Sequence, residues 1–398
     1  MRNLAEFECG ICDREFYGDL SSGQALYTPI LLDKQSGSTI HDGQAEWFSD
    51  WLKESFAKRI SEPLGFEVKR FFALKDKVVL LNCLDTLYGH SLLKLLNAQY
   101  YIDHRPDTSL IVIVPPFLTW MLPEGIAEAW IVDLPLSRGI EWNDWLAHKI
   151  ESLLEPVPEV YLSVAFSHPH GDCFDIERFS RVKPFALGQF ERKDLPVVTF
   201  IWRGDRLWET PDHSDGRLGH LIRRLSVSET AGDQTQRIIR FAECLLGEYP
   251  DLDFAILGIG EAGGFPEWIS DLRLTNLKAD TERAWCERYA RSQIVVGVHG
   301  SNMLLPSAHA GSVIELISAD RWGNYLQDIL FQRSDPREFL FRYRFVPHST
   351  PPEELSSIAS TMLRFSRFRR LMSPEFSKHK EKYDLETFVL TARDNKIN

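Results

Sequence analysis

Runs of consecutive apolar residues recur along this chain, and segments of helical periodicity separate most of them. In the first half, the apolar runs predict strands at 77–83, 109–114, 129–134 and 159–166. The helical pattern predicts helices at 91–101 and 143–154. Strands that alternate with helices are typical of a parallel sheet covered on both faces. We therefore expect an α/β domain over residues 61–190.

The second half repeats this alternation. Its apolar runs predict strands at 197–202, 254–257, 294–298 and 312–317. Helices are expected at 230–248, at 281–291 and, as a short element ending at His309, between the last two strands. The stretch 183–196 has the composition of a linker. We therefore expect a second α/β domain over residues 191–350.

Two flanking segments have a different pattern. Residues 1–60 are expected to form an irregular extension that ends in an amphipathic helix, with apolar positions at Trp47, Phe48, Trp51, Leu52, Phe56 and Ile60. Residues 351–398 are expected to be helical and basic. Basic amphipathic helices are attracted to anionic membrane surfaces, so peripheral membrane contact through this segment is an alternative to packing on the protein.

Composition narrows the class of protein. The chain has 398 residues, of which 44% are hydrophobic, so two domains can each bury a core. Its net charge of -12 argues against an extended nucleic-acid surface. The six cysteines are scattered apart from Cys9 and Cys12, which is typical of a reducing compartment. No apolar run is long enough to span a membrane, and the first residues lack the apolar region of a signal peptide. We expect a cytoplasmic protein.

The turn at His299, Gly300, Ser301 and Asn302 is the strongest candidate for chemistry. It joins a buried strand to the start of a short helix, where backbone N–H groups and the helix dipole favour a phosphate. Glu315 follows inside the next strand, where an ionised carboxylate needs a donor such as a sugar hydroxyl. A phosphate site followed by an acid on the next strand indicates a nucleotide-sugar site.

These residues resemble those of glycosyltransferase family 61. That family has a strand, the sequence H-G-A-x-L-T-N, a short helix and a strand that ends in an acidic residue. The corresponding residues here are His299-Gly300-Ser301-Asn302 and Val313-Ile314-Glu315-Leu316, and the match covers roughly 50 residues. Ser301-Asn302-Met303 departs from the family's Leu-Thr-Asn pattern. The resemblance implies a GT-B fold, with two Rossmann-like domains whose parallel sheets face a cleft and a C-terminal helix that crosses back to the first domain.

Two loops of the second domain are candidates for the rest of the donor site. Arg203 and Arg206 directly follow a predicted strand, and the arginine fork suits a pair of diphosphate oxygens. The alternative is that Asp205 pairs with one of them in a surface turn. Gly258 and Gly260 belong to a G-x-G-x-x-G sequence that also fits a dinucleotide fingerprint. That fingerprint requires an acidic residue at the end of the next strand, roughly 20 residues on, whereas Asp280, which has this spacing, is expected at a helix start. Trp202, Trp208 and Trp322 could stack on a sugar or base, or lie in the core.

An inverting transfer requires a base for the acceptor hydroxyl. In GT-B enzymes this base normally comes from the first domain, so Asp85 and His90, in the loop after its first strand, are the candidate catalytic residues. His299 is expected to donate to phosphate or sugar.

Three sequences resemble metal-binding motifs, but each departs from its motif in a way that favours an ordinary turn or loop. Cys9-x-x-Cys12 lacks a second ligand pair at zinc-binding spacing. His168-x-His170-x-Asp172 resembles a zinc-hydrolase motif, but Cys173 stands where that motif has histidine. Asp251-x-Asp253 precedes its strand and so lies at the edge away from ligands. We therefore expect no metal and no cofactor other than the nucleotide-sugar substrate.

The sequence thus predicts a metal-independent glycosyltransferase, with a nucleotide-sugar donor and a glycan, lipid-linked or protein acceptor. Two alternatives remain open. One is a nucleotide-sugar epimerase of the same fold, and the other is a non-catalytic carbohydrate-binding partner of a transferase.

Overall fold

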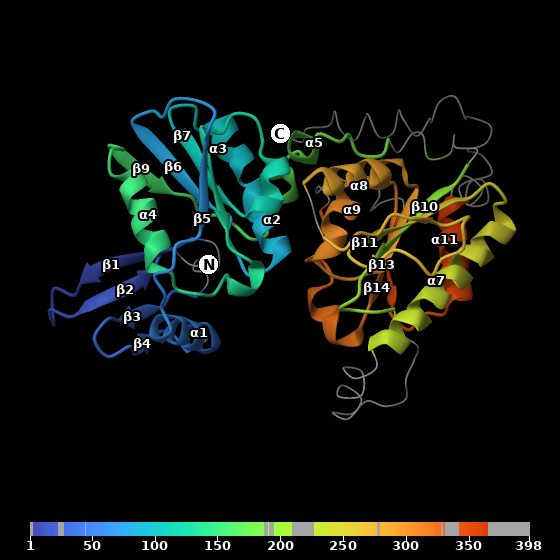
Figure 1. Cartoon of the computed structure of the whole chain (residues 1–398), viewed down its shortest axis with the longest axis horizontal. Helices are drawn as coiled ribbons and strands as arrows, with labels where there is room; N and C mark the ends of the chain where they lie inside the picture. Colours follow the sequence, from blue (N-terminus) through green and yellow to red (C-terminus); the bar gives the residue numbers. More distant parts are fainter. Residues whose placement is uncertain are drawn as a thin grey trace, which may run out of the picture. The chain divides into compact units, whose positions relative to one another are not determined.

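The computed structural model describes residues 3–22, 28–43, 45–186, 190, 195–208, 227–276, 279–327, 329–330 and 342–364. Within these ranges, the side chains of 172, 227–231 and 279–280 are not described. The chain divides into two compact units, Met1–Ser180 and Arg181–Asn398. Figure 1 shows the helices and strands of each unit.

The first unit contains a five-stranded sheet in the order β5-β8-β7-β6-β9. Its strands are β5 (Gly65–Arg70), β6 (Lys77–Asn82), β7 (Ser109–Val114), β8 (Glu128–Asp133) and β9 (Glu159–Leu162). β6 to β9 are parallel, and β5 is an antiparallel edge strand. In chain order the parallel strands lie 3-2-1-4, so the order reverses between β6 and β9. Ligands of open α/β sheets bind at the carboxyl ends of the strands at such a switch point.

Helices cover both faces of this sheet (Figure 1). They are α2 (Tyr88–Leu96), α3 (Ala98–His104), α4 (Asp144–Leu154) and, near the end of the unit, α5 (Ile176–Ser180). Short 3₁₀ turns span Pro116–Met121, Leu136–Arg138 and Gly171–Cys173. β6, β7 and β8 and the helix α4 supply the core on one face, in which Trp130 is 1% exposed. The helix predicted at 91–101 is two helices, with the break at Asn97.

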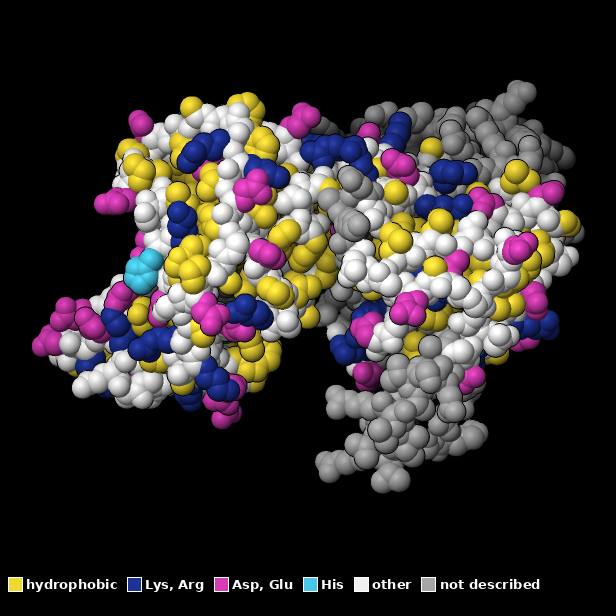
Figure 2. Space-filling view, in the orientation of Figure 1, with side chains coloured by type: hydrophobic (Ala, Val, Ile, Leu, Met, Phe, Trp, Pro, Cys, Tyr) yellow, Lys and Arg dark blue, Asp and Glu magenta, His cyan; other side chains and the backbone are white. Residues whose placement is uncertain are grey.

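The expectation of an irregular segment before residue 60 was wrong. It forms a four-stranded antiparallel sheet of β1 (Leu4–Glu8), β2 (Glu15–Asp19), β3 (Leu31–Asp33) and β4 (Thr39–Ile40), followed by α1 (Glu46–Ala57). Ile30, Leu32, Phe48 and Leu52 form a small core between this sheet and α1. The predicted amphipathic helix is confirmed as α1. Acidic side chains gather at the free end of the β1–β2 hairpin (Figure 2).

The second unit contains a six-stranded sheet in the order β12-β11-β10-β13-β14-β15. Its strands are β10 (Val197–Trp202), β11 (Asp253–Gly258), β12 (Ser270–Asp271), β13 (Ile294–Val298), β14 (Val313–Ile317) and β15 (Tyr343–Pro347). All neighbours are parallel, and the chain order is 3-2-1-4-5-6. This is the strand order of nucleotide-binding doubly wound folds, with the switch point between β10 and β13.

The two faces of this sheet are covered by different helices (Figure 1). The helices are α7 (Val227–Glu248), α8 (Ala279–Arg291), α9 (Leu304–His309) and α11 (Pro352–Leu363), and 3₁₀ turns span Ser301–Met303 and Ala319–Asn324. α7 and α11 pack together and bury Phe241 and Leu355 against the apolar face of β10, β11 and β13. The α/β class expected from the sequence is therefore confirmed in both units.

The structure describes the C-terminal segment only as far as Arg364. α11 packs on α7 of its own unit. The expected basic residues at 367–382 therefore lie outside the described residues, as does the crossing of a C-terminal helix to the first unit. Among the described helices, none combines the length and apolarity needed to cross a membrane.

Candidate functional site

The switch point of the second sheet brings together two predicted segments. Arg203 and Arg206 follow the carboxyl end of β10, and His299 to Asn302 follow the carboxyl end of β13. Nη1 of Arg203 donates to Oδ1 of Asn302 at 2.8 Å and to the His299 carbonyl at 3.3 Å. Nη1 of Arg206 donates to the same carbonyl at 2.7 Å. Both arginines therefore contact one turn, although nearly one hundred residues separate the two segments.

Arg203 also pairs with Asp205, as the alternative interpretation of this loop expected. Nε and Nη2 of Arg203 donate to the two carboxylate oxygens of Asp205 at 2.9 and 2.6 Å. The hydrogen bonds from Arg203 lower the pKa of Asp205. The Asp205 side chain is 72% exposed, whereas that of Arg203 is 14% exposed. The Asp205 carboxylate is therefore the accessible member of the pair, and an incoming dianion can take its place on Arg203.

Gln234 of α7 fixes the backbone of the loop that carries Arg203. Its side chain, 1% exposed on α7, donates to the Arg203 carbonyl at 3.1 Å and accepts from the Trp208 N–H at 2.8 Å. Gln234 is not among the residues predicted from the sequence. The only available signal was a polar residue on the apolar face of a helix.

Gly300 is required by its neighbours. Its φ is 147°, and a Cβ there would lie 1.8 Å from Nη1 of Arg203. Any side chain would therefore displace the arginine. The helix after this turn, α9, has six residues, so its dipole is a minor source of positive potential. The positive charge at this edge comes mainly from Arg203 and Arg206. A phosphate at Ser301 and Asn302 would therefore be held by these arginines more than by the helix N-terminus on which the prediction relied.

The prediction that Glu315 contacts a sugar hydroxyl is contradicted by its environment. Glu315 is fully buried in β14. Its Oε2 lies 2.6 Å from Nδ1 of His299, and its Oε1 accepts from the Tyr343 hydroxyl at 2.5 Å. The carboxylate is therefore stabilised by protein groups. One of these groups is the His299 ring, which is itself 2% exposed.

The roles predicted for Gly258 and Gly260 also change. A Cβ at Gly258, where φ is 133°, would lie 2.3 Å from the Trp202 carbonyl, and one at Gly260 would lie 2.8 Å from the Trp202 indole nitrogen. The glycines therefore let the loop pack on Trp202. Residues 259–269 contain no helix, so a dinucleotide fingerprint, which needs a helix after the glycines, does not apply.

Arg273 completes this loop. Its guanidinium lies 4.4 Å from the centre of the Trp202 ring, and it pairs with Asp271 at 2.7 Å. Trp202 and Trp208 are 7% and 1% exposed and belong to the core, so neither presents a face for stacking. Trp322 is 45% exposed. Of the three predicted stacking residues, only Trp322 is on the surface.

The switch point of the first sheet contains the two candidate catalytic residues. Asp85 follows β6, and Nδ1 of His90 on α2 lies 3.3 Å from its Oδ1. Nζ of Lys94 donates to Oδ2 of Asp85 at 2.7 Å, and both side chains are at least 93% buried. His168, in the loop after β9, places its ring 5.7 Å from that of His90. The two loops on either side of the switch point therefore meet at His90.

The environment of Asp85 makes it a poor base. Burial alone would raise its pKa, but the contact with His90 and the charge of Lys94 outweigh burial and hold the pKa well below its usual value. A carboxylate this weakly basic takes a proton from a hydroxyl inefficiently. This environment favours His90 over Asp85 as the candidate base, and both assignments stay predictions.

The metal alternatives gain no support from the geometry. Cys9 and Cys12 lie in the turn between β1 and β2, and no disulfide joins them. Asp253 pairs with Arg288 at 2.7 Å at the amino end of β11. Within the described residues, no three His, Cys, Asp or Glu side chains are grouped closely enough to hold a metal ion. Metal-independent transfer stays a prediction.

Comparison with known proteins gives weak similarities. No family model and no curated protein matches the chain, so the resemblance to family 61 rests on its motif alone. ADP-heptose LPS heptosyltransferase II of E. coli is a similar solved structure, with 11% identity over 73% of this chain and 99% of that one and a TM-score of 0.39. A second E. coli heptosyltransferase, solved with ADP, has 10% identity, coverage of 75% and 98%, and a TM-score of 0.33.

A third similar structure comes from Listeria monocytogenes and is proposed to be a UDP-N-acetylglucosamine 2-epimerase. Its identity is 10%, it covers 77% of this chain and 97% of that one, and its TM-score is 0.40. Similarities at this level concern the α/β architecture only. The function proposed below therefore rests on the residues of this chain.

Proposed function

We propose that this protein is a glycosyltransferase of GT-B type that binds the diphosphate of a nucleotide-sugar donor at the β10–β13 switch point. The supporting observation is the convergence of Arg203 and Arg206 on the turn after β13. This turn lies where the strand order 3-2-1-4-5-6 opens a crevice for nucleotides.

The chemistry of transfer explains why two arginines are suited to this position. When the sugar leaves the donor, a nucleoside diphosphate remains and its new negative charge must be stabilised. Arginine offers several N–H donors in a rigid fork that matches phosphate oxygens. Preorganised donors of this kind stabilise charge as it develops in the transition state. The buried His299–Glu315–Tyr343 series fixes the turn that both arginines contact.

On the first unit, we propose that His90 accepts the proton of the acceptor hydroxyl and that Asp85 positions it. The side chain of His90 is 21% exposed, which leaves the ring accessible, and Asp85 is held by Lys94. Asp85 would stabilise the imidazolium that forms during transfer. The acceptor, a glycan on its own or linked to lipid or protein, would be bound by this unit, and the donor by the second.

A dinucleotide-binding protein, an epimerase and a carbohydrate-binding partner each differ from a glycosyltransferase in what they bind or consume. Dinucleotide binding needs a glycine-rich turn after the first strand of the sheet, and Arg203-Gly204-Asp205-Arg206 occupies that place here. An epimerase would consume the donor without an acceptor. A carbohydrate-binding partner would bind sugar or nucleotide without turnover.

Calorimetric titration with UDP, GDP, ADP, CMP and NAD, with and without EDTA, tests the donor site. We expect one nucleoside diphosphate to bind independently of EDTA. Arg203→Ala should weaken it at least tenfold, or about 1.4 kcal/mol. Arg240→Ala is the matched control, because Arg240 is an exposed arginine that pairs with Glu353 away from the site. His90→Gln should leave this affinity unchanged and abolish transfer.

Each other outcome favours a different function. Binding of NAD in preference to every diphosphate would contradict the donor site. Equal affinity in Arg203→Ala and the native protein would remove Arg203 from it. Turnover of a nucleotide sugar without acceptor would support the epimerase, and transfer that persists in His90→Gln would exclude His90 as the base.

A further inference from the structure

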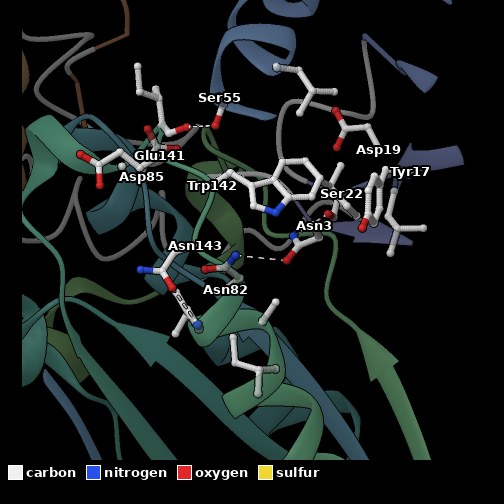
Figure 3. Close-up of a pocket in the computed structure, with 18 of the residues that line it drawn as sticks. Asn3, Tyr17, Asp19, Ser22, Ser55, Asn82, Asp85, Glu141, Trp142 and Asn143 are labelled. Atoms are coloured by element: carbon white, nitrogen blue, oxygen red, sulfur yellow. Dashed lines mark hydrogen bonds between the residues drawn. The ribbon is translucent and has the colours of Figure 1, made fainter. Parts of the chain in front are cut away.

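The first unit contains a pocket of about 430 Å³, separate from the arginine turn of the second unit. Its lining comes from the β1–β2 hairpin and α1 on one side. On the other side it comes from the carboxyl end of β6 and the segment before α4 (Figure 3). The volume is in the range of small-molecule sites. Asp85 and Thr86 contribute to the lining, so the pocket adjoins the loop of the candidate base.

Aromatic side chains form part of the wall. The rings of Tyr17 and Trp142 lie 4.8 Å apart in an edge-to-face arrangement, and Phe56 packs against Trp142 at 5.3 Å. The Trp142 indole lies in the middle of the pocket view (Figure 3). Trp51 of α1 also lines the pocket and is 46% exposed, which gives the wall an aromatic edge toward solvent. Such faces pack against the apolar C–H surface of a sugar ring.

Amide groups fix the polar part of the lining. Nδ2 of Asn82 donates to Oδ1 of Asn3 at 3.1 Å, and Nδ2 of Asn3 donates to the Ser22 hydroxyl at 2.8 Å. Oδ1 of Asn82 accepts from the Leu84 N–H at 3.0 Å. This network joins the end of β6 to both ends of the hairpin. It holds amide and hydroxyl groups, which can donate and accept, in fixed positions beside the aromatic wall.

The charges around the pocket oppose an anionic ligand. Among the lining residues that the structure describes, five are carboxylates: Glu6, Asp19, Asp85, Glu141 and Glu151. The only basic residue in this described lining is Lys94, whose ammonium is engaged by Asp85 at 2.7 Å. A phosphate or uronate would meet an excess of negative charge here. Carboxylates and amides are instead suitable acceptors for sugar hydroxyls.

We propose that this pocket binds an uncharged glycan, with Trp51 and Trp142 against the ring faces and the Asn3–Asn82–Ser22 network toward the hydroxyls. The assignment of this glycan as the acceptor rests on the proposed function, whereas its binding does not. It follows that the segment before residue 60 is part of a binding site, because without the hairpin and α1 the pocket has no outer wall.

A glycan array that carries neutral and acidic oligosaccharides tests the proposal on the full chain. We expect neutral glycans to bind and acidic ones not to bind. The strongest neutral glycan is then measured in solution with Trp51→Ala and with Trp268→Ala. Both tryptophans are exposed, at 46% and 39%, but Trp51 lines the pocket, whereas Trp268 belongs to the second unit and is not part of the lining. Trp51→Ala should weaken binding at least about fivefold, and Trp268→Ala should stay within about twofold.

A second variant guards against indirect effects of the exposed tryptophan. Asn3→Ala removes one side chain of the amide network and should also weaken the same glycan. Selective binding of acidic glycans, no binding to any glycan, or equal affinity in Trp51→Ala and the native protein would overturn the proposal. Nucleoside diphosphate binding, measured on the same samples, separates the two sites. If the native protein binds no nucleoside diphosphate, the donor site is contradicted and the proposal for the glycan pocket is unaffected.

Discussion

The two switch points of this molecule have the same topology and opposite chemistry. In both units the first four parallel strands lie in the order 3-2-1-4, and two loops diverge on either side of strand 1. In the second unit, the loop after β10 carries Arg203, Arg206 and the exposed carboxylate of Asp205, and the loop after β13 carries the turn that both arginines contact. In the first, the two loops carry His90 and His168 around the buried Asp85–Lys94 pair. The same strand order therefore provides a place for a ligand, while the loop side chains decide its charge.

Burial is the main physical difference between the ion pairs at the two sites. Asp85 and Lys94 are almost completely buried, so water cannot readily replace either partner. Asp205 is largely exposed, so water can replace Arg203 as its partner. A buried pair is costly to break on one side, whereas a pair with one partner in solvent costs less to break. The first site is thus suited to hold a fixed arrangement, and the second to exchange a carboxylate for a ligand.

The largest expected effect comes from breaking the buried pair on one side. Lys94→Met removes the ammonium partner of the buried Asp85 carboxylate, which keeps the N–H donors of Thr86 and Leu87. The variant should reduce the free energy of unfolding by about 3 kcal/mol, measured by urea denaturation at pH 7. The double variant Asp85→Asn/Lys94→Met should recover most of this loss. A single variant as stable as the native protein would show that the pair is not buried in solution.

The same pair predicts a response to pH. Because the folded-state pKa of Asp85 is lowered, its stabilisation is complete above its ordinary pKa of about 3.9 and is lost as pH falls below it. The unfolding free energy of the native protein should therefore decline below about pH 4. The double variant, which lacks the carboxylate, should decline less steeply over that range.

A smaller effect is expected from a methyl group at the second site. In Gly300→Ala the new Cβ would occupy the position of Nη1 of Arg203, and a φ of 147° is strained for alanine. The variant should lose about 1–3 kcal/mol of stability and weaken diphosphate binding about as much as Arg203→Ala. Gly323→Ala is the matched control, because no described heavy atom lies within 4 Å of its added Cβ. Undiminished binding in Gly300→Ala would separate this turn from the donor.

The sequence was sufficient to predict the central strands of both sheets. The strands β7, β10 and β13 are continuous apolar runs that are buried on both faces, and their limits agree with the prediction. The β1–β4 sheet and β5 were missed because their strands are short and lack such runs. β1, β4 and β5 are also largely exposed, whereas β2 and β3 are partly buried. Their stability comes from backbone pairing and a few core contacts that no local pattern reveals.

The candidate site was predictable where it depends on topology and unpredictable where it depends on side-chain partners. That Arg203 and His299 lie at the carboxyl ends of parallel strands follows from the strand pattern. That Glu315 is satisfied by Tyr343, and that Gly258 packs on Trp202, depends on contacts between segments distant in sequence. The charged candidates were therefore located correctly along the chain, while the roles of Glu315, Asp85 and the glycines needed the structure.

The smallest expected effect is also the one that most directly compares the two sites. Asp205 competes with a diphosphate for the Nε and Nη2 donors of Arg203. Asp205→Asn should therefore leave stability within about 1 kcal/mol of the native value and strengthen diphosphate binding up to about fivefold, because the exposed pair no longer has to be broken. Calorimetric titration with the preferred nucleoside diphosphate measures this gain. If binding instead weakens, Asp205 holds Arg203 in position as Asp85 holds His90, and the contrast between an exchangeable and a fixed carboxylate no longer applies.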